Sequence, residues 1–425
     1  MFSAPDELKR VNPFDWEHEF PDVMKAGGFD CVIGNPPWGA DLPKTDERYY
    51  RSIYEVAQTS TVDSYSLFIE LATRRLNPNG LLGYITPDTF LRKDDLLPTR
   101  SFLLQKKTVL ELVETGPLFS KVRDTWCLVF TVSNATPTGA EIIRHRKLSR
   151  FITSVEDRLA LFAKSEWSSE TKVSQSVWIS SPKMIVGYRA TEQEQQIIAK
   201  MERRQTLVEQ SDKYKISRGE EGSKFAITTH SSGKFCMVIP ENIERYAVGD
   251  GVRVAGSTLT PTKTVSLYTH PKVWIIRIQK MRWKQRIVCA FDECRNSAGM
   301  KTLQIVVSPT DDVAALMYLS AILASRLINF WCVNYLADDM NQSYLERIPI
   351  HTINFADPAD RARHDKMVQL VESMLALHKH KALAKTQADQ ELFQRQIEAT
   401  DREIDRLVYE LYGLTPEEIA VVEAA

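Results

Sequence analysis

Over roughly the first third of the chain, short apolar runs alternate with a segment of helical spacing. The runs Phe29–Gly34 and Gly80–Pro87 have the length and composition of buried strands, and Asp63–Leu76 between them repeats apolar residues at helical spacing. Two further apolar runs, TVLELVET and TWCLVFTVS, follow before residue 145. Strands that alternate with a helix and are bounded by Gly and Pro are typical of a parallel α/β sheet. We therefore predict an α/β fold for this part of the chain.

The pattern changes twice in the rest of the chain. From about residue 150 to 355, β-branched runs such as VWIIRI and RIVCAF stand among Gly and Thr, which indicates a mixed α/β or mainly β region. From about residue 358, two long stretches have helical spacing, and Gly413 ends the second one. These stretches predict an antiparallel helical hairpin, and the TPEE sequence after it predicts another helix start. We place three domains at residues 1–148, 149–355 and 356–425.

Composition narrows the class of protein. The 425 residues are 43% hydrophobic and 26% charged, which is typical of a globular chain. No stretch approaches 18 consecutive apolar residues, and the first residues lack the apolar core of a signal peptide. We therefore expect a cytoplasmic protein with no membrane segment. The six cysteines show no CxxC pairing, so we expect reduced thiols and no metal site.

The net charge of -1 conceals a basic region. Residues 200–300 contain 18 Lys and Arg against 10 Asp and Glu, and residues 251–291 contain no acid. Within them, Trp274 and Trp283 are interleaved with basic residues, a pattern suited to DNA phosphates. The alternative is a solvated strand face whose tryptophans belong to the core. The candidate DNA-binding residues of this run are Lys272, Arg277, Lys280, Arg282, Lys284 and Arg286.

The sequence FDCVIGNPPWG places Asn35-Pro36-Pro37-Trp38 directly after a predicted strand. Ligands of open α/β sheets bind at the carboxyl ends of the strands. The two prolines fix φ and remove two backbone donors, which leaves carbonyl oxygens beside the Asn35 amide. The loop is therefore predicted to present hydrogen-bond acceptors outward.

Such acceptors suit the exocyclic amine of a purine, whose lone pair is delocalised into the ring. The Asn35 side-chain carbonyl and the Pro36 backbone carbonyl would each take one amine hydrogen and favour the pyramidal, nucleophilic form. Trp38 would stack on a base flipped out of the duplex. The alternative is a turn that ends the strand while Trp38 fills the core.

The chain resembles gamma-class N6-adenine DNA methyltransferases, specifically the family that includes type IIG restriction-modification enzymes. The resemblance extends over almost the whole chain, in the family's order. It implies a partial Rossmann-like methyltransferase sheet, a target-recognition domain and a helical C-terminus. It also implies that Asn35, Pro36, Pro37 and Trp38 form the catalytic motif and that Phe119 is the second aromatic contacting the flipped adenine. The segments that carry the resemblance are PFDWEHEFPDV, GFDCVIGNPPWG, DSYSLFIELATRRLNPNGLLGYITPDTFL, LVETGPLFSKVRDTWCLVF, RLINFWCVNY, YLERIPI and ATDREIDRLVYELYGLTPEEI.

In the same resemblance, the basic run lies in the target-recognition domain, and ISRGEEG is similar to the turn that starts this domain. For Arg218 in that turn, a structural role and a DNA contact remain open. The family usually binds its donor, S-adenosylmethionine, through a Gly-rich strand-to-helix turn upstream of the NPP loop. Only 34 residues precede Asn35, and they contain no such turn. We therefore expect the N-terminal strands and the donor-binding half to be missing through truncation, a split enzyme or degeneration.

These observations predict a site-specific adenine DNA methyltransferase component of a restriction-modification or phage-defence system. Its partner would be double-stranded DNA, together with a second polypeptide that supplies the donor-binding half if the enzyme is split. The alternative is a DNA-binding specificity subunit, or a remnant, without catalysis of its own.

Overall fold

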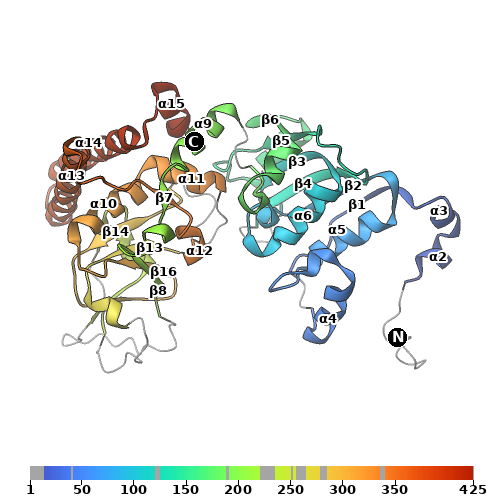
Figure 1. Cartoon of the computed structure of the whole chain (residues 1–425), viewed down its shortest axis with the longest axis horizontal. Coiled ribbons are helices and arrows are strands. Elements are labelled where there is room, and N and C mark those ends of the chain that lie inside the picture. Colours follow the sequence, from blue (N-terminus) through green and yellow to red (C-terminus); the bar gives the residue numbers. More distant parts are fainter. Residues whose placement is uncertain are drawn as a thin grey trace. The chain divides into compact units, whose positions relative to one another are not determined.

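The computed structural model describes residues 14–39, 42–119, 125–187, 191–220, 235–249, 252–254, 265–277, 285–335 and 340–424 (Figure 1). The chain divides into two units, Met1–Ala190 and Thr191–Ala425. The α/β class is confirmed in both. The first unit continues beyond residue 148, because strand β6 (Ser169–Ser174) belongs to its sheet.

A six-stranded mixed sheet organises the first unit, in the order β1-β2-β4-β3-β5-β6. Two neighbouring pairs, β1·β2 and β3·β5, are parallel, and the other three pairs are antiparallel. The predicted all-parallel arrangement is therefore wrong for β4, which returns after a connection too short for a parallel crossover. The remaining strands are β1 (Phe29–Gly34), β2 (Leu76–Pro87), β3 (Thr108–Gly116), β4 (Cys127–Ser133) and β5 (Ile142–Lys147).

Helices cover one face of this sheet (Figure 1). Helix α5 forms where the sequence predicts it, and α6 begins with Pro98 in its first turn. The helices and short 3-10 turns of this unit are α2 (Trp16–Glu19), α3 (Pro21–Lys25), α4 (Lys44–Ile53), η1 (Glu55–Ala57), α5 (Ser64–Arg75), η2 (Asp88–Leu91), η3 (Asp94–Leu96), α6 (Leu97–Lys106), α7 (Val155–Ala163), α8 (Gln175–Ile179) and η4 (Pro182–Met184).

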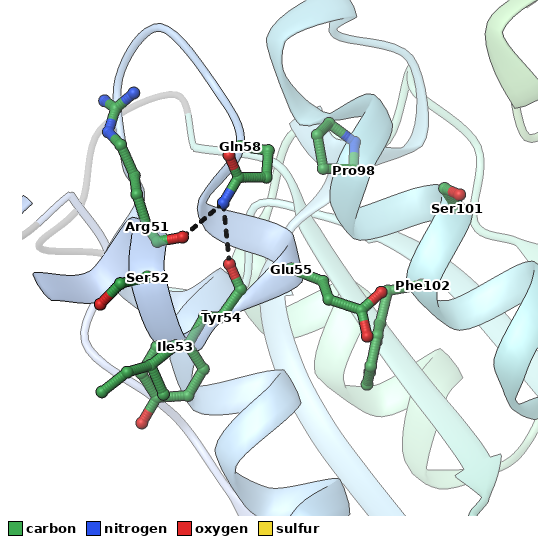
Figure 2. Close-up of a pocket in the computed structure, with 9 residues that line it drawn as sticks. All are labelled: Arg51, Ser52, Ile53, Tyr54, Glu55, Gln58, Pro98, Ser101 and Phe102. Carbon is green, nitrogen blue, oxygen red and sulfur yellow. Dashed lines mark hydrogen bonds between the residues drawn. The ribbon is translucent and has the colours of Figure 1, made fainter. Parts of the chain in front are cut away.

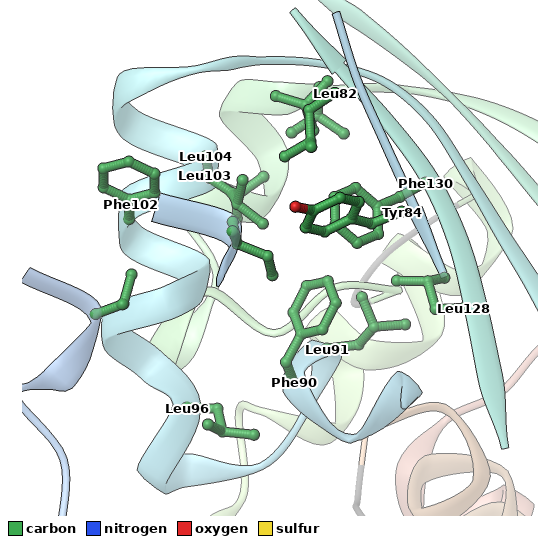
Figure 3. Close-up of a cluster of buried hydrophobic side chains, with 14 of the residues drawn as sticks. Leu82, Tyr84, Phe90, Leu91, Leu96, Phe102, Leu103, Leu104, Leu128 and Phe130 are labelled. Atoms are coloured by element: carbon green, nitrogen blue, oxygen red, sulfur yellow. The ribbon is translucent and has the colours of Figure 1, made fainter. Parts of the chain in front are cut away.

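The core of the first unit lies between the sheet and these helices. Leu82 and Tyr84 of β2 and Phe130 of β4 face Phe90, Leu103 and their neighbours, and all of them are buried (Figure 3). Alternation along a strand sends every second side chain to one face. The core face is therefore made by the even-numbered residues of β2 and β4.

The opposite face of the sheet is exposed near β1. Ile33 is 80% exposed and Leu81 is 40% exposed, and Cys31, the register partner of Leu81, is exposed as well. Among the described residues, β1 pairs only with β2, so it is an edge strand. The prediction that Phe29–Gly34 is a buried strand is therefore corrected. The strand forms, but much of it faces solvent.

The second unit combines small sheets with helices. A four-stranded sheet has the order β14-β13-β16-β8, and a three-stranded sheet has the order β12-β9-β15. Trp274, Tyr268 and Phe235 lie in the core formed around them. The strands of this unit are β7 (Gln205–Thr206), β8 (Lys215–Arg218), β9 (Phe235–Val238), β10 (Ile243–Glu244), β11 (Ala247–Val248), β12 (Val252–Val254), β13 (Lys272–Ile276), β14 (Cys289–Asp292), β15 (Ser297–Gly299), β16 (Leu303–Val307) and β17 (Pro349–Ile350).

The predicted helical hairpin is confirmed as α13 (Pro358–Leu383) and α14 (Gln387–Tyr412), which pack against each other. Gly413 ends α14 with a φ of +68°, a left-handed conformation that suits glycine. Thr415 and Glu418 then form reciprocal hydrogen bonds at the start of the next helix, as predicted. The helices and short 3-10 turns of this unit are α9 (Glu192–Met201), η5 (Val208–Gln210), η7 (Pro240–Asn242), η9 (Val265–Thr269), α10 (Val313–Ala324), α11 (Arg326–Tyr335), α12 (Gln342–Leu345), α13, α14 and α15 (Pro416–Ala424).

In the part of the chain that the structure describes, no single helix has the length and apolar character of a membrane span. The bent pair α10 and α11 meets that test only when the two helices are taken together.

Candidate active site

The Asn35-Pro36-Pro37-Trp38 loop leaves the carboxyl end of β1, as the sequence predicts. Asn35 and Pro37 are exposed, whereas Pro36 is buried. Trp38 is half-buried and packs against the core of the first unit. The loop thus holds an exposed amide beside a ring anchored in the core.

Trp38 and Phe119 lie in contact. Their ring centroids are 5.5 Å apart and their planes meet at 66°, an edge-to-face arrangement. Phe119 follows β3 and is 36% exposed. The fold therefore brings together the two aromatic residues that the sequence assigns to one site, from loops at the carboxyl ends of two different strands.

The start of α5 contacts the loop at the residue before Trp38. The Ser64 hydroxyl donates a hydrogen bond to the Pro37 carbonyl oxygen at 2.7 Å. Burial raises the pKa of the Asp63 carboxyl, and hydrogen bonding from the amides of Gly39 and Tyr65 lowers it in part. Sequence reasoning did not single out either residue. The available signal was the Asp-Ser pair at the start of a predicted helix, a usual capping position.

Two buried polar atoms of this region have no hydrogen-bond partner among the described residues, the Trp38 indole Nε1 and the Asp63 Oδ1. A buried polar atom without a partner costs about 1–3 kcal/mol. Trp38 of the loop therefore retains an unused donor, and Asp63 at the start of α5 retains an unused acceptor.

A buried charged cluster lies where β3 approaches the Phe119 loop. Glu114 accepts hydrogen bonds from Arg92 at 2.6 Å and from His145 Nε2 at 2.7 Å. Burial alone would raise the pKa of Glu114, but the charges of Arg92 and Lys147 and the bond from His145 hold it well below its usual value. Burial lowers the pKa of His145, and its hydrogen bond to Glu114 opposes that shift. The bonds among these buried groups hold the end of β3 in place within the first unit.

Gly116 ends β3 and turns the chain toward Phe119. Its φ is +71°, and a Cβ atom there would lie 2.3 Å from Nη1 of Arg158. That same nitrogen donates to the Thr115 carbonyl oxygen at 2.6 Å. Arg158, buried and lying over the Trp126 ring, therefore occupies the space that only glycine leaves free.

The glycine pair upstream of the loop does not form the turn expected of a donor site. Gly27 and Gly28 have φ values of +99° and +120° and connect α3 to β1, which is a helix-to-strand turn. A Cβ atom on Gly28 would lie 2.5 Å from the Arg75 carbonyl oxygen, so packing against the backbone explains that glycine. The Gly27-Gly28 pair is therefore explained by chain packing and not by the strand-to-helix turn of a donor site.

A surface pocket of about 330 Å³ lies in the first unit, between the end of α4 and α6 (Figure 2). Its polar groups are bound to each other or to neighbours. The Gln58 amide donates to the carbonyl oxygens of Arg51 and Tyr54, and Glu55 pairs with Lys106. No residue of the NPPW loop lines it, so it adds nothing to the candidate active site.

The structure corrects two of the predicted DNA contacts. Lys272 is fully buried, and its ammonium donates to the carbonyl oxygens of Tyr268 and Cys294 and to the Ser297 hydroxyl. Burial lowers its pKa to about 8. Arg286 is only 2% exposed. Neither side chain can reach a DNA phosphate, because each is enclosed by protein.

The other predicted contacts divide into two groups. Arg277 is half-buried at the end of β13, and Arg218 is exposed at the end of β8. Trp274 is buried and its indole donates to Asp292, so the core interpretation holds for this tryptophan. Lys280, Arg282, Trp283 and Lys284 lie outside the described residues.

Within the described ranges, no three His, Cys, Asp or Glu side chains are grouped closely enough to hold a metal ion. The groups that the described structure places at the candidate site are the Asn35 amide, the backbone carbonyls of the loop and the two aromatic rings.

Comparisons with known proteins identify a family whose model matches part of this chain. Residues 3–119 match the model of the Eco57I restriction-modification methylase family. A putative type II restriction enzyme and methyltransferase of Methanocaldococcus jannaschii is 24% identical over 363 residues, 81% of this chain and 29% of that protein. The type II restriction enzyme and methyltransferase RM.Eco57I of Escherichia coli is 31% identical over 136 residues, 29% of this chain and 12% of that protein. The chain thus spans less than a third of either relative.

Two solved structures are similar in fold. MmeI, a type IIL restriction-modification enzyme in complex with DNA, aligns with 98% of this chain and 58% of its own at a TM-score of 0.56 and 11% identity. The type ISP enzyme LlaGI, with a DNA substrate mimic, aligns with 89% of this chain and 37% of its own at a TM-score of 0.53 and 12% identity. Similarity at these identities concerns the fold alone.

Proposed function

We propose that this chain is the catalytic and DNA-reading part of an adenine-N6 DNA methyltransferase. The proposal starts from the Eco57I-like restriction-modification methylase domain that the chain carries. The observation that supports this most is the NPPW loop at the end of β1 with Trp38 against Phe119. The relatives named as type II methyltransferases support the transfer of a methyl group to DNA. The choice of adenine N6 rests on the chemistry of the loop.

The target adenine lies outside the helical stack when it reacts, since no side chain reaches N6 fully inside a duplex. Trp38 and Phe119 would contact its ring. The Asn35 side-chain carbonyl and the Pro36 carbonyl would accept the two hydrogens of the amine. This draws the lone pair of N6 out of conjugation and aims it at the methyl group, so that the acceptors bind the transition state more tightly than the ground state. The methyl–sulfur bond would break as the N6–methyl bond forms, and the protonated amine would then lose one proton to water, so no charged base is required at N6 before the transfer.

S-adenosylmethionine, when bound, supplies an electrophilic methyl group on a sulfonium. Because the described residues provide no glycine-rich turn for it, we infer that further polypeptide supplies the donor contacts, either joined to this chain or as a second subunit. The exposed apolar side chains of Ile33 and Leu81 and the free edge of β1 support this inference. An α/β sheet is normally covered by helices on both faces.

Replacing Asn35 by Ala tests the proposal. Loss of the acceptor should lower the rate of methyl transfer at least about 100-fold while DNA affinity stays within about twofold. The rate is measured as incorporation of labelled methyl groups into DNA, with the polypeptide that completes the donor site where the chain requires one. Asn79→Ala, which removes another exposed amide of the same sheet, is the control and should keep full activity.

Activity retained by Asn35→Ala would refute the catalytic role. The competing function is a DNA-binding specificity subunit without catalysis. It predicts DNA binding by the wild-type chain but no methyl transfer in any assembly that contains it.

A further inference from the structure

The NPPW loop cannot be held by its own backbone in the usual way. Pro36 and Pro37 have no amide hydrogen, so two successive residues are unable to donate to neighbouring carbonyls. The loop must be fixed by groups from elsewhere in the fold. Its geometry matters, because a misplacement of about 1 Å at a reacting centre can cost about 100-fold in rate.

Helix α5 supplies such a group. Ser64 is its first residue and is 3% exposed, and its hydroxyl donates to the Pro37 carbonyl oxygen at 2.7 Å. The first residue of α5 therefore holds the residue that directly precedes Trp38.

The bond to Pro37 also decides which carbonyls remain available. A hydroxyl that occupies the Pro37 oxygen within the protein directs that oxygen toward α5. The acceptor that remains exposed for an incoming amine is the side chain of Asn35, and the Pro36 carbonyl belongs to a residue that is buried in the free chain. Ser64 thus both anchors the loop and orients its carbonyl groups.

We propose that Ser64 is a positioning residue of the methyl-transfer site, which holds Trp38 and the acceptor pair in the geometry that the target base requires. The expected effect of Ser64 on the rate of methyl transfer rests on the proposed function. The effect of Ser64 on the position of the loop does not, because the hydrogen bond from Ser64 to Pro37 exists without DNA or donor.

Helix α5 also provides a matched control. Ser66 lies two residues after Ser64 on the same helix and is 1% exposed. Its hydroxyl accepts a hydrogen bond from the Thr99 hydroxyl. Ser66→Ala removes the same atom at the same burial from the same helix, but its partner lies on α6 and not on the loop. A general weakening of α5 affects both variants, whereas loss of loop position affects Ser64→Ala alone.

The first measurement uses the chain alone. The protein is labelled with 5-fluorotryptophan, and the Trp38 resonance is assigned in ¹⁹F NMR by its loss in Trp38→Phe. Ser64→Ala should shift or broaden this resonance, Ser66→Ala should leave it in place, and Ser64→Thr, which retains the hydroxyl, should restore it. A Trp38 resonance identical in wild type and Ser64→Ala, or altered equally in Ser66→Ala, would overturn the proposal.

The second measurement is the rate of methyl transfer. Ser64→Ala should lower kcat about tenfold or more while the KM for DNA changes less than about twofold, since the hydrogen bond to the Pro37 carbonyl is removed and DNA binding is not touched. Ser66→Ala should keep the wild-type kcat. An unchanged kcat in Ser64→Ala, together with an inactive Asn35→Ala, would reject the role of Ser64 and leave the proposed function intact. Full activity of Asn35→Ala would reject the proposed function while the resonance of Trp38 still reports on the loop.

Discussion

Single residues of this protein take roles that depend on what surrounds them. Lys272 and Lys280 stand eight positions apart in one basic run, yet the ammonium of Lys272 is enclosed by three acceptors of its own unit. The sequence shows that Lys272 is basic, but it does not show that three hydrogen-bond acceptors surround the ammonium group in the fold. Trp38 and Phe119 could be paired in advance, because the family resemblance assigns both to one site. Ser64 could not, since its importance lies in a contact with a backbone carbonyl.

Gly116 gives a prediction at this scale. Gly116→Ala places a Cβ atom against Arg158 and requires a left-handed backbone, so it should destabilise the first unit by about 2–4 kcal/mol, from about 1–2 for the backbone and the rest for overpacking. Gly139→Ala is the control. Its φ is +96° but nothing lies within 4 Å of the added carbon, so it should cost only the backbone part. Urea unfolding followed by circular dichroism measures both, and equal losses would contradict the role of Arg158.

At the scale of helices and strands, some predictions from the sequence pattern match the fold and others do not. Helices α13 and α14 were predictable because their spacing, caps and the terminal Gly413 are all local signals. Strand β1 also forms as predicted, but it is not buried as predicted. A nearly continuous apolar run indicates a strand covered on both faces. Here Ile33 is exposed, because covering a face requires other elements, and their presence is not encoded in the strand itself.

The two faces of the sheet should respond oppositely to substitution. Ile33→Ser should change the stability of this chain by less than about 0.5 kcal/mol, because the side chain is already in water. Leu82→Ala, on the core face of β2, should cost about 2–5 kcal/mol. Urea unfolding compares them. In an assembly that completes the sheet, Ile33→Ser should in addition weaken association, and a large loss of stability in the isolated chain would show that Ile33 is covered.

On the scale of the whole molecule, charge is distributed unevenly. The net charge of -1 hides the basic excess of residues 200–300. The sequence could show this excess, but not which side chains face outward. Two of the six candidate basic residues of the run are enclosed, one is half-buried, and three lie outside the described residues. The location of the basic region was therefore predictable, whereas the exposure of its individual side chains was not.

Salt dependence tests the proposed DNA-reading surface. In a Lys280→Ala, Arg282→Ala, Lys284→Ala triple variant, the slope of log K against log salt should become shallower by about one unit for each phosphate that is no longer neutralised. Lys272→Met, at a residue enclosed by protein, should leave the slope unchanged once its folding has been checked by circular dichroism. Fluorescence anisotropy on duplex DNA at several salt concentrations measures the slope. A triple variant with the wild-type slope would assign these residues to the solvated surface.

The contact between Trp38 and Phe119 has a consequence for affinity. In the proposed function a base that enters between the two rings would need a centroid separation of at least about 4.5 Å from each of them. The centroids are 5.5 Å apart in the free protein, and the rings shield each other from water. A base that enters between them would first have to separate them, and the free energy of that separation would be subtracted from its binding. Under the proposed function the ring contact would therefore raise the apparent Kd of every base that enters and would cover an apolar surface when DNA is absent.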